Sequence, residues 1–192
     1  MYSDRGGYAV ANSAWIPGCQ EWIEKQAGSG WWNPYYVNIM FEPLSGPEDA
    51  VLVQMRRAIE KFYGRFSTRF DRDPRAESSR LRIPRMLLFP DKPVWKREKT
   101  SLRDVSINAG GLHYNGAMMI PRYSRFHGCP IEHIEEKQEV YARHGISRIH
   151  AKPIHEASGI SDYACKTIRW NRVDQDAVLV LPRSIDELPA RD

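Results

Sequence analysis

Strand-like segments joined by short connections constrain the fold of this chain most. Residues 80–90 (RLRIPRMLLFP) are predicted to form a strand interrupted near Pro84, and residues 104–121 (DVSINAGGLHYNGAMMIP) one or two strands that meet at Gly110 and Gly111. The remaining strand-like segments are residues 35–43, 146–154 and 176–182. Several neighbours are linked too closely for the crossovers that parallel strands require. The sequence therefore predicts an α+β fold, in which a mostly antiparallel sheet is flanked by helices on one side.

The strongest helical pattern covers residues 45–66. Ser45 or Gly46 is predicted to cap this helix, and Pro47 occupies its first turn. Apolar residues recur at helical spacing and predict a buried stripe made of Val51, Met55, Ala58, Ile59 and Phe62. Weaker patterns predict helices at residues 131–145, closed by Gly145, and at residues 157–170, with a short helix at residues 19–26.

The length of 192 residues and the hydrophobic content of 42% favour one domain with a real core. We expect an N-terminal extension (residues 1–34), a single domain (residues 35–182) and a polar C-terminal tail (residues 183–192). No apolar run approaches the ~20 residues of a membrane helix, and the first residues lack the layout of a signal peptide. The three cysteines form no CxxC pair, which favours free thiols and a cytoplasmic location.

The formal net charge is +4, and basic residues concentrate between residues 56 and 103. Aromatic residues alternate with them, namely Phe62, Tyr63, Phe66, Phe70 and Trp95. Arginines beside aromatic rings suit phosphates and unstacked bases, although the same pattern arises from a solvated helix whose aromatics lie in the core. The candidate DNA contacts are Arg56, Arg57, Arg65, Arg69, Lys96, Arg97 and Arg122.

Two polar residues interrupt the apolar stretch GGLHYNGAMMIP at residues 110–121. In a strand, residues two apart share a face, so His113 and Asn115 are predicted to point the same way. Two such side chains can hold a divalent cation, or they can satisfy local hydrogen bonds near a glycine-rich bend.

A second motif is SDYACKTI, in which Tyr163 and Lys166 are three residues apart. On a helix the two residues share a face. A tyrosine hydroxyl can attack a phosphodiester if a cation stabilises its negative charge and a metal polarises the phosphate. The alternative is a surface lysine beside a core tyrosine.

Together, LHYNG on a strand and YACK on a later helix resemble the HUH endonuclease superfamily of rolling-circle replication initiators. The resemblance covers residues ~35 to 170, and residues 35–43 lie where the first motif strand of the family usually lies. It implies an HUH/RRM-like sheet of the ferredoxin-like plait type. It also implies that Tyr163 is the nucleophile, that Lys166 helps to ionise or position it, and that His113 is a metal ligand.

The resemblance further implies a Mg²⁺ or Mn²⁺ cofactor. Asn115 stands where the family usually has its second histidine; its amide oxygen can bind a hard cation, with a shorter reach than the glutamine found in some viral initiators. By analogy Asp104 completes the ligand set, with Asn108 and Glu42 as alternatives. His150 and His155 are less favoured neighbours of the site. A zinc site made of His127, Cys129 and His133 is not expected, because their spacing matches no standard set.

The implied activity is the nicking and joining of single-stranded DNA at a replication origin or transposon end, through a 5′-phosphotyrosine. No P-loop motif is present, so a host helicase would supply unwinding, and no membrane partner is expected. Two alternatives remain. One is a catalytically inactive DNA-binding regulator on the same fold, and the other is a basic RRM-like domain that stacks bases on the aromatics of residues 35–41.

Overall fold

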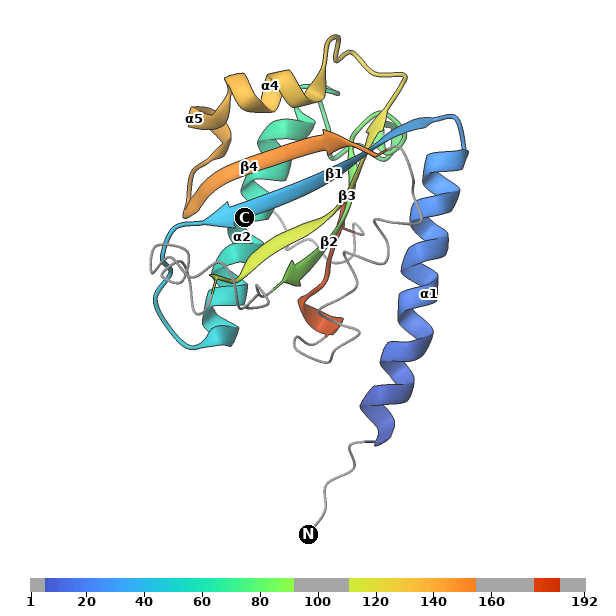
Figure 1. Cartoon of the computed structure of the whole chain (residues 1–192). Helices are drawn as coiled ribbons and strands as arrows, with labels where there is room; N and C mark the ends of the chain where they lie inside the picture. Colours follow the sequence, from blue (N-terminus) through green and yellow to red (C-terminus); the bar gives the residue numbers. More distant parts are fainter. Residues whose placement is uncertain (1–5, 92–110, 155–174, 184–192) are drawn as a thin grey trace, which may run out of the picture.

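The computed structural model describes residues 6–91, 111–154 and 175–183, with side chains from residue 17 onward. Five strands form one antiparallel sheet in the order β4-β1-β3-β2-β5 (Figure 1). The strands are β1 (Trp32–Phe41), β2 (Arg85–Asp91), β3 (His113–Pro121), β4 (Ile146–Pro153) and β5 (Leu179–Leu181). The helices are α1 (Gly6–Gly28), α2 (Glu48–Ser67), α4 (Pro130–Glu136), α5 (Gln138–Tyr141) and the 3-10 turns η1 (Glu77–Ser79) and η2 (Gln175–Ala177). The predicted α+β class with an antiparallel sheet is confirmed.

Helix α2 covers one face of the sheet and forms the main core. Its predicted stripe is confirmed, since each of the five stripe residues is at most 2% exposed, namely Val51, Met55, Ala58, Ile59 and Phe62. They pack with Tyr114, Met118 and Ile120 of the central strand β3. Each fully buried side chain of this size stabilises the fold by ~1.5–3 kcal/mol. The predicted cap is wrong: Pro47 itself is the N-cap residue, because its fixed φ combines with an extended ψ of 160°.

Helix α1 lies against the opposite face of the sheet, so the prediction of helices on one side only is wrong (Figure 1). Cys19 and Ile23 of α1 are buried against β-strand residues of that face, namely Trp32, Leu87, Phe89, Ala117 and Met119. The helix covers only this apolar part of the face. The rest of the face is polar and carries the candidate site.

The expected single helix at residues 131–145 is broken in two at Lys137, whose φ is −108°. The break brings the side chain of Gln138 to the outer edge of β4. There its amide nitrogen donates to the carbonyl of Ile149 at 2.6 Å, and its amide oxygen accepts from the N–H of Ile149 at 3.2 Å. His144 and Gly145 then adopt positive φ and lead into β4.

The remaining strand boundaries follow from proline. Strand β2 begins after Pro84, because proline cannot donate to a strand ladder, and residues 80–84 form turns instead of the first half of a strand. Strand β4 spans the predicted range, and β5 occupies the end of the predicted last strand. No helix in the described part of the chain is both long enough and apolar enough to span a membrane.

Candidate metal site on the polar half of the sheet

A row of polar residues crosses the sheet on the face opposite α2. In the strand register, Asp91 of β2 lies beside His113 of β3, and Asn115 lies beside Asn38 of β1. His150 of β4 is the next partner of Asn38. Because directly paired residues in an antiparallel sheet point to the same side, all five side chains share one face. His113 and Asn115 therefore lie on one face, as the sequence predicted.

Asp91 connects the two predicted ligands. The amide nitrogen of Asn115 donates to Asp91 Oδ2 at 3.2 Å, and His113 Nε2 lies 3.8 Å from the same oxygen. Two atoms that each lie ~2.1 Å from one ion are at most ~4.2 Å apart, so His113 Nε2 and Asp91 Oδ2 can bind one cation. Sequence reasoning missed Asp91, which is the last residue of the strand RMLLFPD. No local signal in the sequence marks it, because its place opposite His113 depends on the register of β2 with β3.

The imidazole of His113 is oriented by a backbone contact. Its Nδ1 lies 3.0 Å from the carbonyl oxygen of Gly111, so Nδ1–H donates to that oxygen and Nε2 is left as the acceptor. A hydrogen bond of this kind fixes the tautomer and ring orientation of metal-binding histidines. The acceptor nitrogen Nε2 is the one that faces Asp91.

Asn115 is fully buried, and its amide oxygen has no hydrogen-bond partner among the described residues. The amide oxygen of Asn38, its cross-strand neighbour, is also buried and has no partner in that part of the chain. Leaving a buried acceptor unsatisfied costs about 1–3 kcal/mol. Amide and carboxylate oxygens with one imidazole nitrogen fit a hard divalent cation. Within residues 6–91, 111–154 and 175–183, no three His, Cys, Asp or Glu residues form a metal-binding group.

Basic side chains of the edge strand β4 flank this polar row. Arg148, His150 and Lys152 alternate with buried residues and are exposed on the same face. Lys152 Nζ lies 5.4 Å from the ring centre of Tyr36, which it partly covers. A phosphate held near His113 would have positive charge from β4 beside it.

The predicted DNA-contacting arginines do not form one continuous track. Arg57 and Arg65 project from α2, on the side of the sheet that is opposite His113. Arg56 is half-buried and donates to the carbonyl of Asp176, and Arg122 follows β3, with its N–H bonded to the carbonyl of Trp31. Arg69 is exposed after the end of α2. These residues therefore serve at least two surfaces.

The aromatic residues interleaved with the arginines belong to the core. Phe62, Phe66 and Phe70 are at most 1% exposed, and they stack on one another or on Tyr141. Tyr63 donates to the carbonyl of Pro84, and burial raises the pKa of its hydroxyl. None of these four rings is available to stack on a base.

Of the zinc candidates, His133 has a hydrogen-bond partner in the core. His133 Nε2 lies 2.8 Å from the hydroxyl of Tyr141, and burial lowers the pKa of His133. Cys129 is a free thiol, as is the buried Cys19.

Several predicted site residues lie outside the described residues. These are Lys96, Arg97, Asp104, Asn108, His155, Tyr163 and Lys166, together with Trp95 and Cys165. Glu42 is described and lies exposed just after β1, where its N–H donates to the carbonyl of Gly145.

Comparison of the chain with protein-family models, with curated proteins and with solved structures gives no match.

Proposed function

We propose that this protein nicks and rejoins single-stranded DNA through a 5′-phosphotyrosine intermediate, with a divalent cation, in the manner of HUH endonucleases. The observation that carries the proposal is the convergence of Asp91, His113 and Asn115 on one sheet face. Asp91 of β2 thus lies beside His113 and Asn115 of β3. The amide oxygen of Asn115, which is buried without a partner among the described residues, supports the presence of a ligand.

The residues that would hold the cation are Asp91 and His113, through a carboxylate oxygen and Nε2, and Asn115, whose side-chain amide would have to turn over so that its oxygen replaces the nitrogen that faces Asp91. A bound Mg²⁺ or Mn²⁺ would supply positive charge to a scissile phosphate oxygen. The contact from Gly111 to His113 Nδ1 keeps the imidazole in the tautomer that this role needs. Arg148 and Lys152 of β4 orient the approaching backbone by charge.

Tyr163 is the proposed nucleophile. Its hydroxyl oxygen attacks the scissile phosphorus and forms the phosphotyrosine bond to the 5′ side, while the bond from phosphorus to the 3′ oxygen breaks. The tyrosine proton passes to solvent, and the leaving 3′ oxygen takes up a proton to become a hydroxyl. Lys166 stabilises the tyrosinate. Attack of a 3′-hydroxyl on the phosphotyrosine reverses the step and joins strands.

The direct test is a covalent adduct assay with labelled single-stranded DNA and Mn²⁺. We expect a protein–DNA band for the wild type that withstands denaturation, and none for Tyr163→Phe. Tyr123→Phe is the matched control, since Tyr123 is 67% exposed and lies after β3, away from Asp91. Because the DNA target is not defined, a library of random single strands serves as substrate. An unchanged adduct in Tyr163→Phe would refute the proposal.

A DNA-binding protein without nuclease activity is the second candidate. It is favoured by the hydrogen bond from Asn115 to Asp91, since such a bond satisfies the carboxylate without a cation. Calorimetry with Mn²⁺ separates the two candidates. Heat of binding that is lost in Asp91→Asn and in His113→Ala supports the nuclease, and DNA binding without any heat from Mn²⁺ supports the regulator.

The RRM-like alternative has less support. It requires exposed rings on β1, but Phe41 is 1% exposed, Tyr36 is 8% exposed, and Tyr35 packs against the main core.

A further inference from the structure

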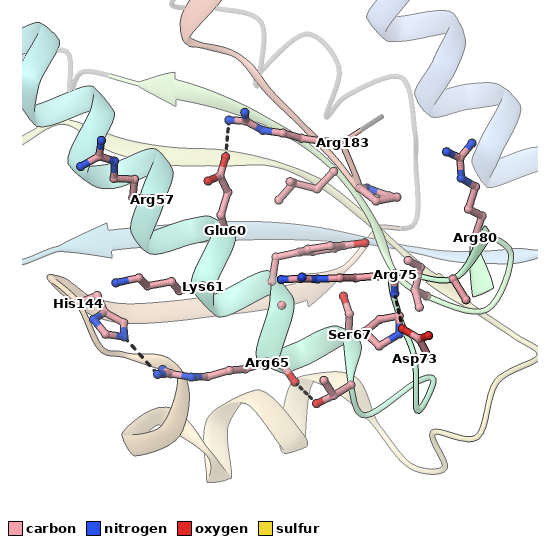
Figure 2. Close-up of a pocket in the computed structure, with 18 residues that line it drawn as sticks. Arg57, Glu60, Lys61, Arg65, Ser67, Asp73, Arg75, Arg80, His144 and Arg183 are labelled. Carbon is pink, nitrogen blue, oxygen red and sulfur yellow. Dashed lines mark hydrogen bonds and ion pairs between the residues drawn. The ribbon is translucent and has the colours of Figure 1, made fainter. Parts of the chain in front are cut away.

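A basic groove lies beside α2 (Figure 2). Because α2 covers the face of the sheet opposite Asp91 and His113, the groove lies on the other side of the sheet from these two residues. It has a volume of about 990 Å³ and is formed by four parts of the chain: the outer face of α2, the loop around η1, the turn before β4 at His144, and the end of β5. Its position separates it from the candidate metal site by the thickness of the sheet. The proposed function does not account for it.

The charge of the groove is strongly positive. Its basic residues are Arg57, Lys61, Arg65, Arg75, Arg80 and Arg183, against the two acids Glu60 and Asp73. Arg183 is paired with Glu60, and Arg65 is held by His144 and by the carbonyl of Val140.

Four of these cations are not neutralised. Arg57, Lys61, Arg75 and Arg80 are exposed, and none of them has an ion-pair partner in the described part of the chain. Figure 2 shows Arg75 extending from the loop toward α2. The pKa of His144 is lowered by burial and by the charges of Lys61, Arg65 and Arg143, which is consistent with a positive potential at this groove. The groove is therefore prepared for an anion.

A helical glycine opens the groove. Gly64 lies within α2 and lines the groove, and a Cβ placed on it would meet no atom within 4 Å. Glycine in a helix costs about 0.5–1 kcal/mol relative to alanine. Among the described residues, none packs so closely against Gly64 that a larger side chain is excluded. Gly64 instead leaves room between Lys61 and Arg65 for another molecule to approach the backbone of the helix.

The lining between the charges is apolar. The half-buried Pro74, Ala76 and Pro182 contribute its accessible surface, and the buried Ile83 and Leu181 lie beneath them. A run of acidic residues such as poly-glutamate presents carboxylates alone, whereas a single-stranded nucleic acid presents phosphates together with the flat faces of unpaired bases. The mixed lining matches the second ligand better.

We propose that this groove binds a segment of single-stranded nucleic acid, with its phosphates on Arg57, Lys61, Arg75 and Arg80 and its bases over the apolar lining. The segment is held on the reverse side of the sheet, apart from the site of cleavage. The inference goes beyond the proposed function and does not depend on strand cleavage.

The first test measures binding of a fluorescent oligothymidylate of about 12 nucleotides, in EDTA, as a function of salt. Each phosphate contact contributes about −0.7 to the slope of log K against log salt, so four contacts predict a slope near −3. The double variant Arg57→Gln/Lys61→Gln should bind about tenfold more weakly at 0.1 M salt and reduce the slope by about 1.4. The control Lys25→Gln/Arg72→Gln removes the same charge outside the groove and should change the affinity less than twofold.

The second test fills the groove without changing its charge. Gly64→Leu should weaken binding of the oligonucleotide at least fivefold while raising Tm, because leucine favours the helix. Gly18→Leu is the matched control, since Gly18 is also a helical glycine with open space around it, on α1. It should leave the affinity unchanged.

Three outcomes would overturn the inference. The first is wild-type affinity in both Gly64→Leu and the double glutamine variant. The second is poly-glutamate binding as tightly as the oligonucleotide, which would assign the groove to an acidic protein. The third is equal weakening by the control variants, which would indicate a diffuse charge effect. A wild-type protein that binds the oligonucleotide in the groove but forms no covalent adduct refutes strand cleavage alone, so the two proposals fail separately.

Discussion

The two faces of β3 differ in how fully their side chains are satisfied. On the face covered by α2, Met118 and Ile120 are buried in the main core, and the hydroxyl of Tyr114 donates to the carbonyl of Ala177 at 2.8 Å. On the opposite face, His113 and Asn115 gather around a buried carboxylate, and the amide oxygen of Asn115 has no partner among the described residues. One strand thus carries a face that stabilises the fold and, at the start of its other face, a polar cluster that costs free energy. Such a cost is typical of a binding site.

The largest expected effect concerns the contact between β3 and β2. A Cβ on Gly116 would lie 2.0 Å from the carbonyl oxygen of Leu87, which is backbone and cannot move aside. Gly116→Ala should therefore lower the free energy of unfolding by more than about 3 kcal/mol, measured by urea denaturation. Gly64→Ala makes the same chemical change in open space and should not destabilise. A Gly116→Ala variant with wild-type stability would contradict the close approach of the two strands.

The next largest effect removes packing from the α2 face. Met118 is fully buried, so Met118→Ala should cost about 3 kcal/mol through lost contacts and a residual cavity. Mn²⁺ binding, measured under conditions in which the variant remains folded, should stay unchanged, because the side chain points away from Asp91. A loss of Mn²⁺ affinity in the folded variant would show that the two faces are coupled.

Alkaline pH tests the same face through Tyr114. Burial raises the pKa of its hydroxyl from 10.0 to about 12. The folded protein holds this proton more tightly than the unfolded chain, so the stability contribution is complete below pH 10 and is lost as the pH rises toward 12. The loss from this residue is about 2–3 kcal/mol. Tyr114→Phe should flatten the pH dependence of urea midpoints in this window, leaving the part due to Tyr63, whose pKa is also raised.

The smallest effect on stability is expected on the polar face. Asn115→Leu removes an unsatisfied buried acceptor, but it also removes the donor to Asp91, so stability without metal should change by less than about 1 kcal/mol. Mn²⁺ at 100 times its Kd should stabilise the wild type by about 2.7 kcal/mol and leave the variant unaffected. A large loss of stability in Asn115→Leu without metal would instead mark Asn115 as structural.

Local sequence patterns predicted the helices and strands that bury one face and expose the other. The stripe from Val51 to Phe62 identified α2, and period-two alternation identified β1 and β4. The shared face of His113 and Asn115 followed from the same alternation.

The features that the sequence did not predict depend on partners distant in the chain. The break at Lys137 accompanies the contacts of Gln138 with β4, and no local signal marks it. Pro17 and Gly18 obscured the length of α1, which packs through Cys19 and Ile23. Asp91 joins the site only through the register of β2 with β3, and that register is a property of the assembled sheet.

The outer edges of β4 and β5, the two edge strands of the sheet, are poorly suited to pairing with a strand of another molecule. The side-chain amide of Gln138 already occupies the N–H and carbonyl of Ile149 on β4, and β5 is only three residues long and runs into Pro182. An unpaired strand edge is a template for self-association. A neighbouring copy would have to displace Gln138 on one side or pair with a three-residue strand on the other. The sheet therefore resists aggregation at its edges, and its faces remain the surfaces available for partners.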